Sequence, residues 1–169
     1  MPPRNWVQLL RPGAPTDLVA AAFFPQSVGM RRLDHFEARL ANVPLFRACS
    51  KQDLRHIARL ADYDSCRAGD VLVREGRRGN ELYVIVNGEA EVTRDGATIA
   101  ALKPGDYFGE LAVLRPAPRT ATVTATTEMD VLIVTARELA ILLGDVPLFA
   151  RKLLTGMAGR IQDADSHAA

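Results

Sequence analysis

The hydrophobic residues of the chain follow three successive patterns. From 31 to 61 they recur every three or four positions, which is the period of amphipathic helices. From 69 to 135 they alternate with polar residues, which is the period of strands. From 136 to 163 the helical period returns, and capping sequences at Ser50 and Thr135 mark the starts of two helices. Gly144 is predicted to end the short helix that begins after Thr135. The chain is therefore predicted to be helical on both sides of a β-rich segment.

The β-rich segment consists of short alternating runs separated by turn sequences. In ELYVIVNG, Leu82 and Val84 face one side of the predicted strand, while Tyr83 and Ile85 face the other. Turn sequences recur at regular intervals, and Asp95-Gly96 between two alternating runs is a strong hairpin signal. Short strands at this spacing favour an antiparallel β jelly-roll barrel over an α/β sheet. The predicted fold class is mainly β, with N-terminal helices before the barrel and C-terminal lid helices after it.

One stretch interrupts the strand pattern: FGELAVLRPAPRTATV at 108–123. The residues after Gly109 suit a single helical turn, and the prolines of 116–118 prevent that turn from continuing. Glu110 and Arg119 stand here among residues that are usually buried, where an unpaired charge is costly. The two could pair with each other, point into water, or bind a ligand that carries hydrogen-bond donors and negative charge.

Length and charge limit the partners that the chain is expected to have. Its 169 residues can bury one full core, so 31–169 are predicted to form a single domain. Residues 1–30 are expected to be a poorly ordered or loosely docked arm, and Met30 could be the biological start. The 21 basic and 20 acidic residues nearly cancel, so neither nucleic acid nor an anionic membrane is expected as a partner. The pair Arg77-Arg78 is too short to change that expectation.

The cysteines and the apolar runs indicate the compartment. Cys49 and Cys66 are the two cysteines, and their spacing suits reduced thiols better than a disulfide framework or a zinc site. The apolar run LVAAAFF at 18–24 is too short to span a membrane. A cytoplasmic protein without a metal centre is therefore predicted. A secretory signal is the alternative, because Arg4 and small residues precede this run, although Pro12, Gly13, Pro15 and Asp17 interrupt the apolar core that such a signal needs.

The 108–123 stretch has the groups needed to bind a small anionic sugar ligand. A short helix after a glycine presents backbone N–H groups to an anion, and the guanidinium of Arg119 can bond a phosphate through two N–H groups. Ionised Glu110 can only accept hydrogen bonds, and sugar hydroxyls are natural donors. A phosphate and a ribose hydroxyl held inside one small barrel describe a compact nucleotide.

Four segments, in order, carry a resemblance to a known family. They are GDVLVREG, GNELYVIVNGE, GDYFGELAVL and PRTATV. This order resembles the cyclic nucleotide-binding domain of protein kinase regulatory subunits, gated channels and bacterial catabolite-activator regulators. The resemblance spans residues 44–163, and the 108–123 stretch is similar to the phosphate-binding cassette of that family. It implies a stand-alone sensor that binds cyclic AMP, or else cyclic GMP, and that needs no other cofactor.

The resemblance also implies roles for individual residues. Arg119 would bind the cyclic phosphate together with the backbone N–H groups of Thr120 and Ala112, and Glu110 would bind the ribose 2′-hydroxyl beside Gly109. The threonine hydroxyl does not separate the two nucleotides, because binders of either kind carry threonine at this position. The apolar wall and lid of the base pocket are expected among Ala121, Val123, Leu153, Leu154 and Met157. Without ligand, Arg119 is expected to be solvated, so that its removal would leave the fold nearly as stable.

The output of such a sensor is expected to depend on another protein. The final helix, 147–163, is predicted to move on ligand binding and so to act on an unidentified protein effector in trans. Gly156 and Gly159 would lower the intrinsic stability of that helix and ease its movement. Permanent packing of the helix on the barrel is the alternative.

Other functional classes lack the residues they need. A metal-dependent jelly-roll enzyme needs histidines on its strands, and none of the three histidines lies between 69 and 135. That segment also has no cysteine or histidine that could serve nucleophilic catalysis. The chain is therefore not expected to be an enzyme. The remaining alternative is a constitutive protein-interaction module that has kept the barrel without relying on ligand, against which the presence of Glu110 and Arg119 argues.

Overall fold

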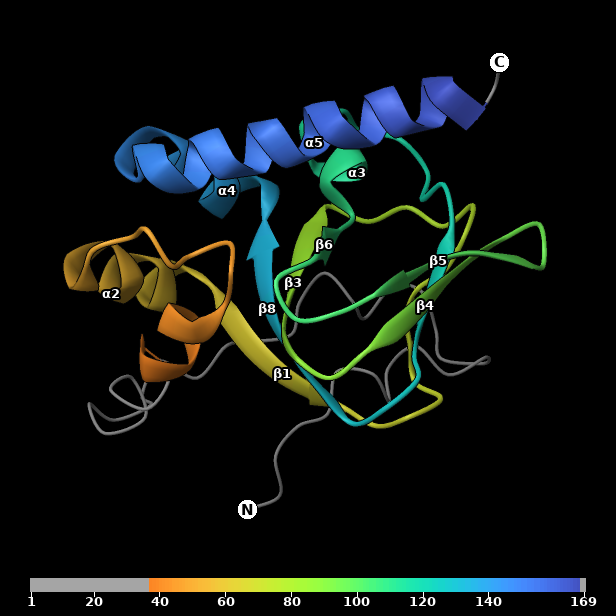
Figure 1. Cartoon of the computed structure of the whole chain (residues 1–169), viewed down its shortest axis with the longest axis horizontal. Helices are drawn as coiled ribbons and strands as arrows, with labels where there is room; N and C mark the ends of the chain where they lie inside the picture. The colour runs from red at the N-terminus through yellow and green to blue at the C-terminus, as the bar shows by residue number, and fades with distance from the viewer. Residues whose placement is uncertain (1–36, 168–169) are drawn as a thin grey trace.

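Two antiparallel four-stranded sheets face each other and form a barrel (Figure 1). The computed structural model describes residues 37–167. The strands of the first sheet lie in the order β1 (Asp62–Cys66), β8 (Met129–Thr135), β3 (Glu81–Asn87) and β6 (Tyr107–Phe108). Those of the second lie in the order β2 (Val71–Val73), β7 (Thr122–Ala125), β4 (Ala90–Arg94) and β5 (Ala97–Leu102). The predicted mainly β jelly-roll architecture is confirmed.

Helices flank the barrel and form one short turn within it. Residues 37–42 are helical, followed by α2 (Lys51–Leu60), while α4 (Ala136–Asp145) and α5 (Pro147–His167) come after the last strand. Capping boxes at Ser50 and Thr135 open α2 and α4 as predicted. Among the described residues, no helix has the length and apolar character needed to cross a membrane.

Two boundaries differ from the predicted ones. The barrel begins with β1 at Asp62 instead of at 69, because β1 is an edge strand that pairs only with β8 and buries only Cys66. A strand with so little burial shows no alternation of apolar and polar residues. The break between α4 and α5 falls at Val146, whereas Gly144 was predicted to end the helix; Gly144 instead continues α4. The predicted arm 1–30 and the first residues of the predicted helix, 31–36, lie outside the described residues.

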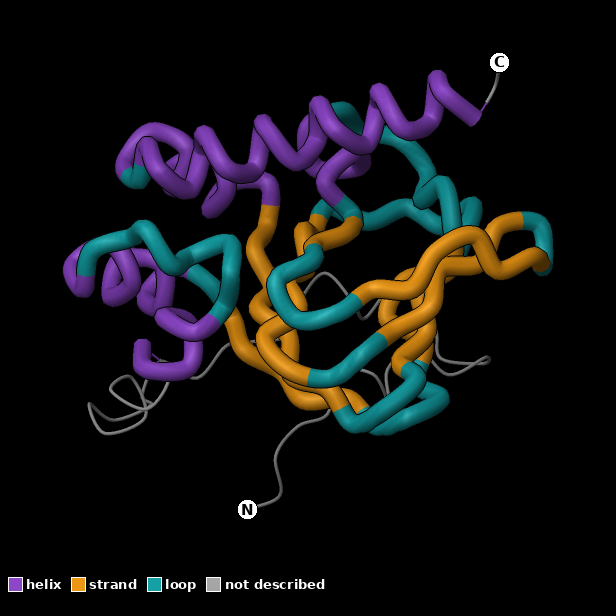
Figure 2. Tube along the Cα trace, in the orientation of Figure 1, coloured by secondary structure: helices purple, strands orange, loops and turns teal. Residues whose placement is uncertain are grey.

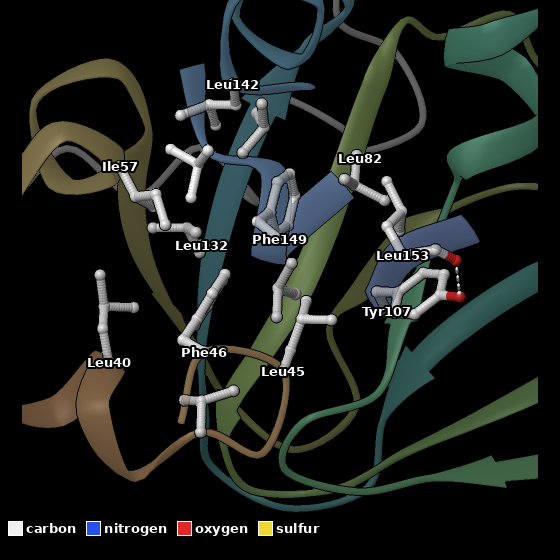
Figure 3. Packing of buried hydrophobic residues seen from close by; sticks show 14 of the residues in the cluster. Leu40, Leu45, Phe46, Ile57, Leu82, Tyr107, Leu132, Leu142, Phe149 and Leu153 are labelled. Carbon is white, nitrogen blue, oxygen red and sulfur yellow. Dashed lines mark hydrogen bonds between the residues drawn. The ribbon is translucent and has the colours of Figure 1, made fainter. Parts of the chain in front are cut away.

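The two faces of the first sheet contribute to two separate cores. Leu82 and Val84 of β3 pack toward the helices with Phe149 and Leu153 of α5 (Figure 3). Ile85 faces the opposite way, into the barrel, with Tyr83 packed partly against that core. This alternation is the one predicted from ELYVIVNG. The helices therefore cover the outside of one sheet, and the barrel interior stays separate (Figure 2).

Helix α5 is held by specific contacts to the barrel and to the turn between the two N-terminal helices. The Tyr107 hydroxyl donates a buried hydrogen bond to the Leu153 carbonyl at 3.0 Å (Figure 3). A side chain at Gly156 would collide with the Tyr107 hydroxyl, so this glycine allows close approach. The Phe149 and Phe46 rings stack with centroids 5.8 Å apart. The expectation that Gly156 eases movement of the helix stays a prediction; in the structure this glycine also makes room for the Tyr107 hydroxyl.

Candidate functional site

The interruption at 108–123 forms a short helix beside the barrel. After β6, Gly109 adopts a left-handed conformation with φ of 84°, which glycine reaches without steric cost, and α3 (Glu110–Leu114) follows. Arg115 is extended and ends the helix ahead of the prolines. In Figure 1, α3 lies between the barrel and α5. The single helical turn predicted from the sequence is present.

Glu110 and Arg119 are the site's defining pair of residues. Their exposed fractions are 7% and 6%, and among residues 37–159 they are the charged residues that are buried. Burying an ion in a protein interior costs on the order of several kcal/mol. This cost applies to both the carboxylate and the guanidinium unless each has hydrogen-bonding or charged partners. The structure therefore excludes the view that the two point into water.

The guanidinium of Arg119 donates three hydrogen bonds, to Glu81 at the start of β3 and to Gly109 directly after β6. Its Nη1 donates to the backbone carbonyls of Glu81 at 2.9 Å and Gly109 at 3.1 Å. Its Nη2 donates to the Glu81 carboxylate at 2.9 Å, which makes an ion pair with a carboxylate that is 34% exposed. These bonds use three of the five N–H groups of the guanidinium. The expectation that unliganded Arg119 is solvated is therefore wrong.

Two glycines make room for the guanidinium. A Cβ added at Gly79 would lie 2.6 Å from Nη2 of Arg119, and one added at Gly109 would collide with Nη1. Both glycines are therefore needed for close approach, and Gly109 is needed for its positive φ as well. Any side chain at either position would have to displace Arg119.

An aromatic pair lies beneath the guanidinium. The Tyr83 ring centroid is 6.0 Å from Cζ of Arg119, and Tyr83 stacks on Phe108 with centroids 4.9 Å apart. Burial raises the pKa of Tyr83, and the negative charge of Glu81 adds to that effect while Arg119 opposes it. The phenol therefore stays neutral at physiological pH and offers the cation a π face.

The other predicted site residues are distributed unevenly. Ala112 is buried on α3, Val123 is buried in the barrel core, Ala121 is partly buried, and Thr120 is exposed next to Arg119. On α5, Leu153 is buried in the helix-facing core, while Leu154 is 58% exposed and Met157 is partly buried. Of the lid candidates, Leu153 therefore has a packing role.

Glu81, Gly79 and Tyr83 were not singled out as site residues from the sequence. Glu81 is separated from Arg119 by 38 positions, and a glutamate at the start of a strand is usually a solvated residue. The useful signal was the glycine before it, in GNELYV, because a glycine there marks a place where another group approaches the backbone closely.

Comparison with known proteins adds the family context. The family model described as the cyclic nucleotide-binding domain matches residues 64–145. A cAMP-dependent protein kinase regulatory subunit from Eremothecium gossypii is 41% identical over 93 residues, which are 54% of this chain and 20% of that protein. A cGMP-dependent protein kinase from Toxoplasma gondii is 37% identical over 100 residues, 59% of this chain and 10% of that protein. The chain thus matches only a small part of the length of these relatives.

A solved structure shares the fold. The catabolite activator protein of Thermus thermophilus superposes with a TM-score of 0.67 at 25% identity, covering 74% of this chain and 61% of that one. The residues matched by the family model, 64–145, include the interruption that carries Glu110 and Arg119.

Proposed function

Because the chain belongs to the cyclic nucleotide-binding domain family, we propose that it binds a 3′,5′-cyclic nucleotide at the site around Glu110 and Arg119. Cyclic AMP is the expected ligand, and cyclic GMP is the competitor to be tested. The observation that carries the proposal is the burial of both charged side chains on one short segment of the barrel. Burial of a carboxylate and a guanidinium stabilises a fold poorly, which favours a role in binding.

The phosphate and the ribose are assigned to different groups. Arg119 binds the cyclic phosphate with the N–H groups that Glu81 and Gly109 leave, assisted by the backbone N–H groups of Thr120 and Ala112. Glu110, beside Gly109, accepts a hydrogen bond from the ribose 2′-hydroxyl. Charge-assisted bonds contribute about 1.5–3 kcal/mol each, and burial of the base supplies the rest of the ~8 kcal/mol that micromolar affinity requires.

The base is covered by apolar residues from the barrel and from α5. Ala121 and Val123 form the wall. Leu154 and Met157 are the cap residues in this proposal, because Leu153 is already packed in the core and Leu154 is exposed. Capping the base would bury Leu154, which contributes to affinity through the hydrophobic effect.

The signal passes to a protein effector in trans, and the moving part is α5. A ligand shifts such an equilibrium only if it binds the two positions of the helix with different affinity. In this proposal the chain regulates its effector by binding the ligand and catalyses no reaction itself. It does so in the cytoplasm. Hydrogen exchange with and without cyclic AMP tests the movement: protection should change in 147–159 as well as in 109–120. A change confined to 109–120 would exclude α5 as the moving part.

The binding mode is tested by combining a variant with a ligand analogue. Glu110→Gln should weaken cyclic AMP binding about tenfold, a loss of ~1.4 kcal/mol, but should have little effect on 2′-deoxy cyclic AMP, which lacks the hydroxyl. Glu128→Gln, at an exposed position, is the matched control and should bind like the wild type. Equal losses for both ligands would remove Glu110 from the ribose.

One observation favours a second candidate function. Since Glu81 and Gly109 already bind Arg119 without a ligand, the retention of Arg119 is also compatible with a structural role. In that case the barrel would be a constitutive interaction module, and neither cyclic nucleotide would bind.

A further inference from the structure

The buried residues of the site provide little net attraction for an anion in solution. The Arg119 charge is paired with the Glu81 carboxylate at 2.9 Å, and Glu110 adds a second carboxylate. A cyclic nucleotide carries one negative charge on its ring phosphate. Long-range attraction toward the site must therefore come from other side chains.

The loop between β2 and β3 lies directly against Arg119. The backbone N–H of Gly76 donates to the Arg119 carbonyl at 2.8 Å, and the backbone N–H of Arg119 donates to the Arg77 carbonyl at 2.8 Å. This loop carries Arg74, Arg77 and Arg78, and all three are exposed. Among the described residues, none of these three side chains forms an ion pair, so no close partner compensates their charges.

Two further arginines belong to other elements of the site: one contacts the residue after Arg119, and one ends the helix that carries Glu110. Arg94, at the end of β4, donates from Nε to the carbonyl of Thr120 at 3.0 Å. Arg115 follows α3 directly and is exposed. Apart from the site residues Glu81 and Glu110, the acids on these segments are Glu75, Glu91 and Asp95. The Asp95 N–H donates to the Glu75 carboxylate at 3.0 Å, and the Thr98 hydroxyl donates to the Glu91 carboxylate at 3.3 Å. The arginine rim is defined as Arg74, Arg77, Arg78, Arg94 and Arg115.

We propose that the arginine rim steers anionic cyclic nucleotides into the site. This inference rests on the proposed function and adds a kinetic role for residues that do not bind the phosphate in the final complex. Charge of one sign around a concave site raises association rates by about 10–10³-fold at low ionic strength. The effect is on association and not on dissociation, because exposed arginines remain hydrated and are screened over about 8–10 Å in physiological salt. Five arginines against three acids, Glu75, Glu91 and Asp95, give the rim its positive sign although the whole chain is nearly neutral.

The test is a stopped-flow measurement of the full chain with a fluorescent 8-substituted cyclic AMP. The variant is Arg77→Glu with Arg78→Glu, and the control Arg47→Glu with Arg59→Glu makes the same change of charge at exposed positions before and on α2. In Figure 1, α2 lies on the opposite side of the barrel from the β4–β5 hairpin. Rates are measured at about 20 mM and about 500 mM NaCl, where the Debye length falls from about 20 Å to about 4 Å.

At low salt the rim variant should associate about 3- to 10-fold more slowly than the wild type, with unchanged dissociation, and the difference should vanish at high salt. The control should associate like the wild type. If the acidic variant does not fold, Arg77→Gln with Arg78→Gln should show about half the logarithmic effect.

Four results would overturn the inference. Equal association rates for the rim variant and the wild type at low salt would mean that these arginines do not steer the ligand. Faster dissociation with unchanged association would mean that they contact the bound nucleotide instead. If the wild type binds but its association rate does not depend on salt, only the steering role of the rim is overturned. If the wild type does not bind cyclic AMP at all, the proposed function is overturned as well.

Discussion

Replacing Arg119 by alanine should destabilise the unliganded domain as well as abolish phosphate binding. The side chain donates to two backbone carbonyls, those of Glu81 and Gly109, and pairs with the Glu81 carboxylate. Alanine removes all of these donors at once. The acceptors remain in a place where Gly79 and Gly109 leave no other side chain to replace the guanidinium.

The expected loss is about 2–4 kcal/mol of unfolding free energy. A buried acceptor left without a donor costs about 1–3 kcal/mol, and two carbonyls lose a donor. The Glu81 carboxylate adds little, since its side chain is 34% exposed and can turn into water. Water entering the vacated space reduces the cost of the two carbonyls, which places the estimate below the sum of the two maximal penalties.

Urea unfolding of the full chain without nucleotide, followed by circular dichroism, measures the effect. With a slope of about 2 kcal/mol per M, the midpoint should fall by about 1–2 M. Arg115→Ala removes an exposed arginine from the same segment and should change stability by less than about 0.5 kcal/mol. A double-mutant cycle with Glu81→Gln should give a coupling energy below about 1 kcal/mol, because the Glu81 carboxylate is partly exposed. If Arg119→Ala has the same midpoint as Arg115→Ala, the buried contacts do not stabilise the domain and the reasoning is refuted.

Three further predictions test other contacts. Gly79→Ala should weaken cyclic AMP binding about tenfold or more, because its Cβ would lie 2.6 Å from the guanidinium, whereas Gly144→Ala, with nothing within 4 Å, should leave titrations unchanged. Tyr107→Phe should lower the unfolding free energy in urea by about 1 kcal/mol, since its hydroxyl bonds the Leu153 carbonyl; an unchanged midpoint would show that this bond contributes nothing. Burial raises the pKa of the Cys66 thiol to about 12 from an ordinary 9.0. Because only the unfolded thiol ionises between these values, the unfolding free energy of the wild type should fall as pH rises from 9 toward 12. The unfolding free energy of Cys66→Ala should fall less over the same range. Equal pH dependence of the two unfolding free energies would contradict the effect of burial on this thiol.

The sequence pattern predicted the fold where burial was one-sided or alternating. Residues 81–87 alternate between two cores, so their strand and both of its faces were predictable. Strand β1 was not, because an edge strand with one buried residue has no alternation to detect. Gly144 was misjudged for a related reason, since a glycine inside a helix costs only about 1 kcal/mol, which packing overrides.

The site was predictable in its charges but not in its partners. Glu110 and Arg119 stood out because charges among apolar residues are unusual, and both are buried in the structure. The partner Glu81 could not be found, because its contact with Arg119 depends on how two distant segments cross. The role of Gly156 was missed for the same reason: its need for space arises from Tyr107, a residue of another element.

Isothermal titration of the full chain with cyclic AMP, and separately with cyclic GMP, tests most directly whether this barrel is a nucleotide sensor. We expect one-to-one binding of cyclic AMP with a micromolar dissociation constant, which corresponds to a binding free energy of about −8 kcal/mol. Arg119→Lys should abolish this binding, because a lysine cannot reproduce the bidentate contact with the phosphate. The absence of heat with both nucleotides at millimolar concentration, together with an unchanged melting temperature, would contradict the proposed function and favour the constitutive interaction module.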